Sequence, residues 1–420
     1  MQDELSKCDP EVAHFIQLEE IRQREGLELI ASENYVSPAV LQAAGSVLTN
    51  KYAEGLPKKR YYGGCQFVDE IESLAISRVC SLFGAKFANV QPHSGSSANM
   101  GAYLAALSNF TPTPDNPKAK ILGLSLNHGG HLTHGGKMNF SGKLFEGHEY
   151  FLDPLTEEIH YDQLRDIAKK IRPQLIIAGA SSYPRKINFK LFKEIATEVN
   201  ALFLVDMAHI AGLVAAKLHP DPFPYADIVT TTTHKTLRGP RGGVILTNDE
   251  QWIKKINSMV FPGIQGGPLE HIIAAKAVCF KQALEPSFIT YQQNVLSNAK
   301  ALAQSLMERG FELATKGTDN HLMLVKLLNT QLTGLQSETL LEEVHLTCNK
   351  NMIPNDPRPS NVTSGIRIGT PAITTRGLGT NECRIVGNLI ADRLNNPQNE
   401  TIKKQVLDQV LEICKKFPIY

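Results

Sequence analysis

The sequence lacks most of the features that would assign a protein to a specialised class. Its 43 basic and 42 acidic residues leave a formal net charge of +1, so the composition gives no general attraction to nucleic acid or anionic membranes. No apolar run approaches the roughly 18 residues that a membrane-spanning helix requires. The first residues are polar and lack the apolar segment of a secretory signal peptide, so we expect no signal sequence.

The cysteines also exclude two classes of small fold. There are seven, scattered along the chain, and no two form a Cys-x-x-Cys pair. This spacing indicates neither a disulfide framework nor a zinc ribbon, so we expect free thiols and a cytoplasmic location. The P-loop motif G-x-x-x-x-G-K-[ST], internal repeats and low-complexity tracts are missing as well. With 420 residues, 42% of them hydrophobic, the chain can form a large core, and we expect two domains.

One stretch of the sequence, residues 230–243 (TTTTHKTLRGPRGG), has an unusual composition. A β-branched run that leads into a Gly/Pro-rich turn predicts a strand followed by a loop, with Lys235 at the break. Neighbouring cations and burial both lower the pKa of a lysine, and a neutral lysine is a nucleophile toward carbonyl groups. A solvated basic turn is the alternative interpretation.

Further polar residues follow buried strands or precede helices. The apolar run 201–205 ends at Asp206, with His209 close behind, where open α/β sheets bind ligands; a helix cap is the alternative role for Asp206. Residues 93–99 are rich in serine and glycine and lead into a helix, which suits a phosphate group but is also common capping sequence.

Two more patterns suggest ligand contacts. His128, His131 and His134 are spaced three apart in a glycine-broken loop after the predicted strand 121–126; such histidines could bind a metal, stack on a flat ligand or transfer protons. Arg367 lies in an alternating apolar strand, where its planar fork suits a carboxylate, although a structural salt bridge is equally compatible.

The patterning also predicts a series of helices. They cover residues 9–26, 37–48, 68–83, 100–107, 189–200, 269–284, 291–309, 337–344 and 381–417.

These signals together describe an amine nucleophile, an acid at a strand end, a phosphate cradle, a flat stacking partner and a carboxylate fork. Pyridoxal phosphate (PLP) acting on an amino acid requires all five. The chain in fact resembles the serine hydroxymethyltransferase family along nearly its whole length. The blocks that carry the resemblance are residues 29–35 (LIASENY), 59–65 (KRYYGGC), 91–96 (QPHSGS), 128–135 (HGGHLTHG), 205–209 (VDMAH), 230–236 (TTTTHKT), 263–268 (GIQGGP) and 364–367 (SGIR).

The resemblance implies an α/β fold of type I among PLP-dependent transferases, similar to aspartate aminotransferase, with a mainly parallel sheet in a large domain and a smaller α+β C-terminal domain. The expected divisions are residues 1–35 as an N-terminal arm and helix, 36–285 as the PLP-binding domain and 286–420 as the small domain. It further implies a homodimer, or a dimer of dimers, whose subunits share active sites.

The implied reaction is the reversible transfer of the serine hydroxymethyl carbon to tetrahydrofolate, giving glycine and 5,10-methylenetetrahydrofolate, through a PLP external aldimine and retro-aldol cleavage. A folate-independent threonine or β-hydroxy-amino-acid aldolase on the same scaffold is the alternative. Two hypotheses from other classes are RNA binding through residues 58–60 (KKR), which the near-neutral charge disfavours, and a metal enzyme built on His128, His131 and His134.

The resemblance also implies roles for individual residues. Lys235 would form the Schiff base, Asp206 would pair with the pyridine nitrogen, and His131 would stack on the ring. Arg241 would keep Lys235 neutral, and Glu54 would transfer a proton. The other cofactor contacts would be Gly95, Ser96, Ser181, His209, Thr232 and His234, with Tyr52, Gly266 and Gly267 from the partner. The substrate would be bound by Ser32 and Arg367 at its carboxylate, by Glu54 and Tyr62 of the neighbouring chain, and by a tetrahydrofolate pocket of Tyr61, Leu126, Gly130, Leu132 and Asn351.

The sequence departs from the family pattern at several positions. Lys58 stands where the family usually has glycine, and a proline-rich insertion covers residues 111–118. Asn361 and Leu378 replace residues that are commonly aromatic in the family. Lys58 and Asn361 leave the affinity for folate open.

Overall fold

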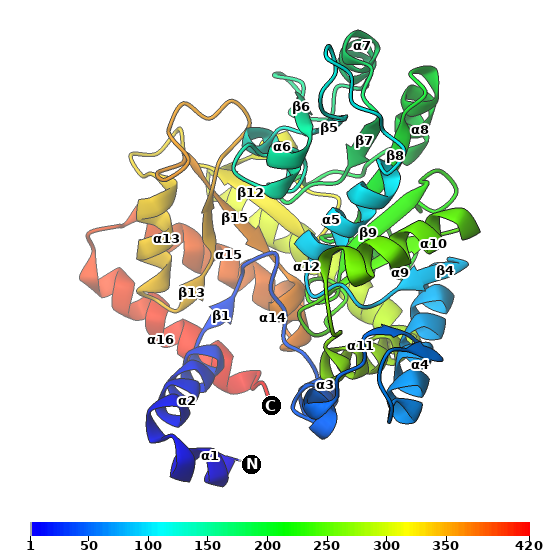
Figure 1. Cartoon of the computed structure of the whole chain (residues 1–420). Coiled ribbons are helices and arrows are strands. Elements are labelled where there is room, and N and C mark those ends of the chain that lie inside the picture. Colours follow the sequence, from blue (N-terminus) through cyan, green and yellow to red (C-terminus); the bar gives the residue numbers. More distant parts are fainter. Residues whose placement is uncertain (1) are drawn as a thin grey trace.

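Two hydrophobic cores, each built around its own β-sheet, make up the protein (Figure 1). The computed structural model describes residues 2–420. The larger core surrounds a seven-stranded sheet and the smaller a four-stranded sheet, and the long helix α12 (Pro286–Glu308) passes between them. Within the described residues, no helix combines the length and the apolar character needed to cross a membrane.

The seven-stranded sheet has the order β4-β10-β9-β8-β7-β5-β6. Its strands are β4 (Phe87–Asn89), β5 (Lys120–Leu124), β6 (Glu146–Tyr150), β7 (Leu175–Ala178), β8 (Leu202–Asp206), β9 (Ile228–Thr232) and β10 (Gly243–Thr247). The pairs from β6 through β9 are parallel, whereas β10 is antiparallel to both β9 and β4. The expectation of a mainly parallel sheet is therefore confirmed, and the segment after the TTTT run returns as an antiparallel hairpin strand.

Both faces of this sheet are covered, which explains why its strands are continuous apolar runs. Successive side chains point to opposite faces, so Leu204 packs on one side and Phe203 and Val205 on the other. Helices α5 (Gly95–Ala106) and α10 (Glu250–Ser258) cover the first face. The second face is covered by α4 (Gln66–Phe83), α7 (Tyr161–Ile171), α8 (Phe189–Glu198), α9 (Ala211–Ala215) and α11 (Glu270–Ala283).

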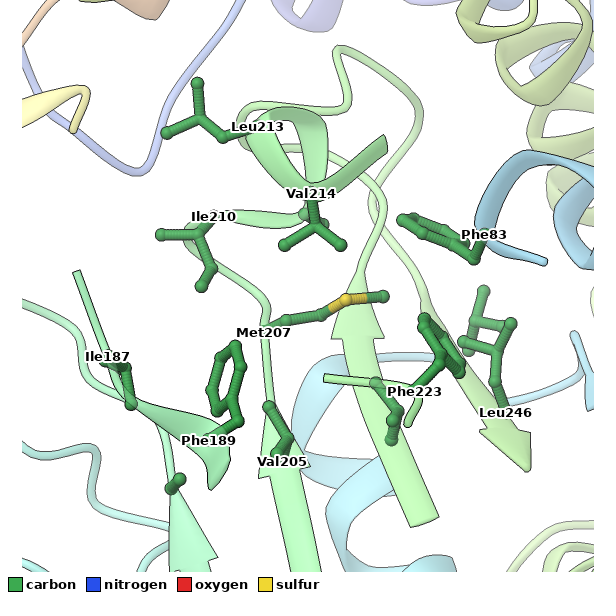
Figure 2. Packing of buried hydrophobic residues seen from close by; sticks show 14 of the residues in the cluster. Phe83, Ile187, Phe189, Val205, Met207, Ile210, Leu213, Val214, Phe223 and Leu246 are labelled. Carbon is green, nitrogen blue, oxygen red and sulfur yellow. The ribbon is translucent and has the colours of Figure 1, made fainter. Parts of the chain in front are cut away.

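Figure 2 shows part of the second face at the carboxyl end of β8. The side chain of Met207 lies among Val205, Val214 of α9 and Phe223, and Phe83 from the end of α4 closes the cluster. This packing fixes the end of β8 on the second face of the sheet. It therefore holds the adjacent Asp206, whose side chain points to the other face, in a rigid position.

The smaller core is an antiparallel sheet covered by helices. Its sheet has the order β11-β12-β15-β14, with β11 (Glu312–Leu313), β12 (Leu322–Lys326), β14 (Asn349–Asn351) and β15 (Gly365–Gly369). The helices around it are α13 (Gly334–Glu342), α14 (Pro371–Thr375), α15 (Thr380–Asn395) and α16 (Glu400–Lys416). The predicted helix over 381–417 is thus wrong in one respect, because the chain breaks between α15 and α16 around Pro397.

The N-terminal segment belongs partly to the smaller core. After α1 (Gln2–Cys8) and α2 (Pro10–Glu25), the short strand β1 (Leu27–Glu28) pairs in parallel with β13 (Leu346–Thr347). Leu27 and Leu29 are fully buried among residues of that core. Asp9 caps α2 as expected, accepting a hydrogen bond from the backbone of Val12, but the apolar side chains of this helix remain exposed.

Helix α12 contributes to both cores. Its first half, including Phe288 and Val295, packs in the larger core, and its second half, including Leu302 and Leu306, packs in the smaller one. The boundary expected at residue 285 therefore stays a prediction, with the change between cores occurring inside the helix. Further short elements lie earlier in the chain. Helix α3 (Pro38–Ala44) and the hairpin of β2 (Gly55–Leu56) and β3 (Lys59–Arg60) precede α4, and the short α6 (Phe140–Leu144) precedes β6.

Candidate active site

A cavity of about 180 Å³ lies where β8 and β9 end and α5 begins. Nine residues predicted to contact a cofactor line it: Gly95, Ser96, His131, Ser181, Asp206, His209, Thr232, His234 and Lys235. The cavity sits at the carboxyl edge of the parallel strands, which is where open α/β sheets bind their ligands. Sequence reasoning gave no individual role to Asn99, which also lines the cavity, and named His134 only as one of the three histidines of a possible metal set.

Lys235 is buried just beyond the end of β9. Burial lowers the pKa of its amine to about 8, and the nearby guanidinium groups of Arg367 and Arg241 add to the effect, while Asp206 opposes it. The exposed Arg241 thus acts in the predicted direction, but burial is the larger cause. A lysine with such a pKa is partly neutral near pH 8, which makes it a competent nucleophile.

Asp206 ends β8 and has three hydrogen-bond donors. Its Oδ2 accepts from Nε2 of His134 at 3.0 Å and from Nδ2 of Asn99 at 2.9 Å, and its Oδ1 accepts from the backbone N–H of Ala208 at 3.0 Å. Burial is the largest influence and would raise the pKa of this carboxyl, but the hydrogen bond and charge of His134, with His131 and the hydrogen bond from Asn99, together hold the pKa of Asp206 well below its usual range. Asp206 is therefore an ionised carboxylate inside the cavity.

His131 faces the same space with a neutral ring. Burial, together with His134 beside it, lowers the pKa of His131 to about 4, and its Nδ1 lies 2.7 Å from the hydroxyl of Thr133. The three histidines proposed as a metal set do not form one, because His128 turns away and its Nδ1 accepts from the backbone of Leu152. Potential ligand atoms of His131, His134 and Asp206 do lie within 4.8 Å of one another, inside the cavity.

The other end of the cavity is rich in hydrogen-bond donors. Helix α5 begins at Gly95, with Ser94 as its N-cap, so its first backbone N–H groups lie beside the hydroxyl of Ser96. A Cβ atom on Gly95 would come within 2.6 Å of Thr232, which leaves room only for glycine. His234 is neutral, since burial lowers its pKa to about 3, and its buried Nδ1 has no protein partner.

Arg367 projects from β15 toward the cavity from the smaller core. It donates to the backbone carbonyl of Ser181 at 2.8 Å, to Asn349 at 3.2 Å and to the hydroxyl of Ser32 at 3.2 Å. No carboxylate of the described residues forms an ion pair with it, so the structural salt bridge considered from sequence is not found between residues 2 and 420. Burial lowers its pKa to about 10, and the negative charge of Glu33 opposes this effect without forming an ion pair with it.

His209 meets a second buried histidine that the sequence did not indicate. Its Nδ1 lies 3.3 Å from Nε2 of His321, and the two rings stack with centroids 5.5 Å apart. Burial lowers the pKa of both imidazoles, that of His321 to about 3. His209 is thus an uncharged part of the cavity wall, backed by His321.

The threonine run forms the frame around Lys235. Thr230 donates to Oδ1 of Asn99 at 2.6 Å, which leaves the Asn99 amide to donate to Asp206. Thr231 donates to a backbone carbonyl of its own strand, and Thr233 donates to the carbonyl of Pro240 across the lysine loop. The hydroxyls therefore hold both the acid and the turn that presents the lysine.

Five other predicted residues gather elsewhere. Tyr52 donates to Glu54 at 3.2 Å and packs edge-on against Tyr62 with ring centroids 4.9 Å apart, and both Gly266 and Gly267 lie against this cluster. None of the five lines the cavity that contains Lys235. Within one chain, these residues therefore do not complete the site.

The residues predicted to bind folate also lie in two separate regions of the chain. Leu126, Gly130 and Leu132 lie on the loop that contains His131, and Asn351 donates to the hydroxyl of Ser182 on a neighbouring segment. Leu126 and Leu132 are about half exposed, at 53% and 45%. Tyr61 instead lies in the other region, against Phe261.

The proposed RNA-binding tripeptide is not a free basic patch. The guanidinium of Arg60 is buried between Asp69 at 2.8 Å and Glu72 at 2.7 Å. Only Lys58 and Lys59 are exposed. Arg60 therefore fixes the β2–β3 hairpin to α4 rather than offering charge to an RNA backbone.

The donors and acceptors of the cavity fit PLP. A helix N-terminus, a serine hydroxyl and the unpartnered Nδ1 of His234 suit a phosphate at one end. The ionised Asp206 suits a protonated ring nitrogen, and the neutral ring of His131 suits stacking on a flat heterocycle. Lys235 supplies an amine for the aldehyde.

Comparisons with known proteins agree with this chemistry. The family model for serine hydroxymethyltransferase matches residues 5–390. The serine hydroxymethyltransferase of Crocosphaera subtropica is 56% identical over 418 residues, covering 100% of this chain and 96% of its own. The serine hydroxymethyltransferase of Prochlorococcus marinus (strain AS9601) is 55% identical over 416 residues, covering 99% of this chain and 96% of its own length. The one from Nostoc sp. (strain PCC 7120) is 55% identical over 418 residues, covering 100% of this chain and 96% of its own length.

Proposed function

The chain belongs to the serine hydroxymethyltransferase family, and from this we propose how its residues carry out the family's reaction. The protein is a fold-type I, PLP-dependent transferase of one-carbon metabolism. It reversibly transfers the hydroxymethyl carbon of serine to tetrahydrofolate, which gives glycine and 5,10-methylenetetrahydrofolate. PLP, when bound, supplies a conjugated ring that absorbs the charge left at Cα when the bond from Cα to Cβ breaks.

One observation carries the proposal: a lysine of lowered pKa and an ionised aspartate face the same cavity. Lys235 is the group that binds the cofactor aldehyde, because burial favours its neutral amine. Asp206 holds a proton on the ring nitrogen, because the hydrogen bonds from His134 and Asn99 keep its carboxylate ionised. His131 would cover one face of the ring. Ser181, His209 and Thr232, which line the same cavity, would contact the side of the cofactor that carries its hydroxyl.

The phosphate is bound at the start of α5. Gly95 and Ser96 offer backbone N–H groups and a hydroxyl, and the free Nδ1 of His234 offers one more hydrogen bond. Neutral donors and a helix dipole can hold a phosphate without adding a cation next to Lys235. In this arrangement Arg241 contributes only to the pKa of the lysine.

Arg367 and Ser32 bind the carboxylate of the amino acid. The guanidinium is buried and lacks an anionic partner among the described residues, so a substrate carboxylate would compensate a charge that is otherwise unpaired. Its planar fork also orients the carboxylate. The amino acid is thereby held with its amine toward Lys235.

We further propose a homodimer in which each subunit completes the site of the other. Tyr52, Glu54 and Tyr62, with Gly266 and Gly267, form a cluster away from the cavity of their own chain. A groove of about 470 Å³ reaches His234, Arg241 and Ser32 from outside, and it could receive such a cluster from a second copy. Exposed apolar side chains on α2, including Phe15 at 67%, support an additional contact surface. Glu54 would then act as the proton-transfer residue near the serine hydroxyl.

Tetrahydrofolate would bind over the loop after β5. Leu126 and Leu132 offer exposed apolar surface there, and Asn351 offers an amide nearby. Gly130 allows the loop to pass close to β5, since a Cβ atom at this position would lie 2.0 Å from the carbonyl of Leu124. Tyr61 would come from the second subunit together with Tyr62.

The free cysteines suit the cytoplasm, the location we propose. All seven lie unpaired, and burial raises the pKa of five of them, which makes those thiols poorly reactive: Cys80, Cys279, Cys348, Cys383 and Cys414.

The test is serine cleavage by the purified, PLP-loaded protein with and without tetrahydrofolate. We expect the folate to accelerate loss of the hydroxymethyl carbon strongly, and we expect a yellow protein whose visible absorption band disappears in Lys235→Ala. Equal rates with and without tetrahydrofolate would support the aldolase alternative instead. A protein that binds no PLP would overturn the assignment of the cavity.

A further inference from the structure

Asn34 reaches the main chain of Lys235 from the segment between β1 and α3. Its Nδ2 donates to the carbonyl oxygen of Lys235 at 3.0 Å and to the hydroxyl of Tyr291 at 2.8 Å. Its Oδ1 accepts from the hydroxyl of Thr375 at 2.7 Å and from the backbone N–H of Tyr35 at 2.9 Å. A carboxamide has two N–H donors and two acceptor lone pairs, so every hydrogen-bonding position of Asn34 is used.

These partners come from both cores. Tyr291 is buried in the first half of α12, where its ring lies 4.2 Å from the guanidinium carbon of Arg238, three residues after the lysine. Its hydroxyl donates to the carbonyl of Pro371, the first residue of α14. Thr375 ends the same helix. Asn34 therefore fixes the lysine loop of the larger core to α14, next to the smaller core.

The same short segment also contacts the predicted substrate-binding arginine. Ser32, two residues before Asn34, accepts a hydrogen bond from Arg367. The chain just before Ser32 is anchored to the end of β15, because the backbone N–H of Gly369 donates to the carbonyl of Leu29 at 2.7 Å. Ser32 and Asn34 thus connect the carboxylate fork and the lysine through a single intervening residue.

We propose that Asn34 is a positioning residue that holds the main chain of Lys235 at a fixed distance from the Ser32–Arg367 pair. The amine of Lys235 and the carboxylate site then lie at a spacing that lets one amino acid contact both. A loss of this hydrogen bond would let the lysine loop shift while the carboxylate site stays in place. The proposal rests on the proposed function, since it assigns substrate binding to Arg367 and cofactor binding to Lys235.

A purely structural role is the competing explanation, and the chain offers a matched control for it. Asn298 is more deeply buried than the partly buried Asn34, at 1% exposure, and its Nδ2 also joins α12 to the region of α14, donating to Thr374 at 2.9 Å and to the carbonyl of Leu378 at 2.8 Å. It makes no contact with the lysine loop. Substituting Asn298 therefore removes the same kind of buried amide without freeing Lys235.

The experiment compares Asn34→Ala with Asn298→Ala in the PLP-loaded protein. For Asn34→Ala we expect kcat for serine cleavage with tetrahydrofolate to fall about ten- to a hundredfold, with KM for serine changed by less than about threefold, because orientation is lost and carboxylate binding is kept. For Asn298→Ala we expect a lower melting temperature and kinetic constants within about twofold of wild type.

A second readout follows the lysine directly. Asn34→Asp places a carboxylate against the Lys235 carbonyl, so the pH midpoint for capture of PLP by the cofactor-free protein should rise, whereas Asn298→Asp should leave it unchanged. If Asn34→Ala does not yield folded protein, Thr375→Val removes one anchor of the amide and should lower kcat in the same direction, about two- to fivefold.

The positioning role is overturned if the Asn34 and Asn298 variants match in kcat and in the pH midpoint. In that case wild-type protein would still form the cofactor band and respond to tetrahydrofolate. A wild-type protein without that band and without folate-dependent cleavage would instead overturn the proposed function. The two failures are therefore distinguishable.

Discussion

The imidazole of His134 and the carboxylate of Asp206 are in hydrogen-bond contact, with Nε2 and Oδ2 3.0 Å apart. Because a carboxylate can only accept, the Nε2 of His134 carries the proton that is donated. This contact is the main reason that the pKa of Asp206 stays low despite complete burial. The state of the acid at the cofactor ring thus depends on a residue that the ring itself need not touch.

Removing the His134 donor should make the ionised form of Asp206 less stable. We expect His134→Leu to raise the pKa of Asp206 and to lower kcat for serine cleavage about ten- to a hundredfold, since a hydrogen bond to a charged group contributes about 1.5–3 kcal/mol. Asn99→Leu removes a neutral donor to the same oxygen and should cost less. Steady-state kinetics of both variants provide the measurement, and a larger effect at Asn99 would contradict this ranking.

Cofactor capture should depend on pH through Lys235. The neutral amine attacks the aldehyde, and it predominates above the pKa, which burial lowers to about 8. The rate at which cofactor-free protein gains the visible absorption band should therefore rise with pH around a midpoint near 8. Arg241→Gln removes one neighbouring cation and should move the midpoint upward by less than burial has moved it downward. A midpoint near the 10.4 of an ordinary lysine would contradict the site.

Substrate affinity should depend on the fork of Arg367. Arg367→Lys keeps the charge but loses the paired N–H geometry, so KM for serine should rise about ten- to a hundredfold, which corresponds to about 1.5–3 kcal/mol of charge-assisted hydrogen bonding. Arg393→Lys is the control, because Arg393 is also buried, at 1% exposure against 8% for Arg367, but bonds to Glu343 at 2.7 Å, in the smaller core. It should reduce thermal stability and leave KM unchanged.

Sharing of sites between subunits can be tested with two inactive variants. Lys235→Ala removes the amine, and Glu54→Gln removes the proton-transfer group. If Glu54 serves the partner's site, random mixing gives hybrid dimers with one intact site, and activity should recover to about a quarter of wild type. If Glu54 serves its own chain, every hybrid site has a defect and the mixture stays inactive.

Replacing Lys58 with glycine should stabilise the protein. It is the second residue of the two-residue turn between β2 and β3, after Pro57, and its φ of 63° lies in the left-handed region that favours glycine. We expect Lys58→Gly to stabilise the protein by about 0.5–1 kcal/mol in chemical denaturation. The neighbouring Lys59→Gly should destabilise it instead, because Lys59 lies in the strand β3.

Sequence reasoning named Lys235, Asp206 and Ser96 because separate local signals agreed with one another and with the family resemblance. Asp206 ends a buried strand, Lys235 follows one and Ser96 lies in the first turn of a helix, and such strand ends and helix starts meet at one edge of a parallel sheet. Most of the helices were predictable because their apolar periodicity is local, whereas the mainly parallel sheet was expected from the family resemblance. The departure at Lys58 was also visible, although only the turn geometry explains why glycine is favoured there.

Contacts that depend on side-chain direction could not be predicted. Asn99 is a lone carboxamide in a helix of small residues, and nothing local shows that it faces Asp206 and Thr230. The three-residue spacing of the histidines suggested one set, but the chain turns at Gly129, whose φ is 94°, and this directs His128 away from His131. Asn34 lay in a recognised motif, yet its partner is two hundred residues later in the chain.

The pairing of β1 with β13 has a consequence during synthesis on the ribosome. Leu27 and Leu29 emerge early, but the core that buries them requires strands and helices from the last third of the chain. At about 5–20 residues per second, the roughly 300 intervening residues take about 15–60 s to translate. Throughout that time Leu27 and Leu29 lack the core that buries them, so the smaller core cannot form until nearly the whole chain has been made.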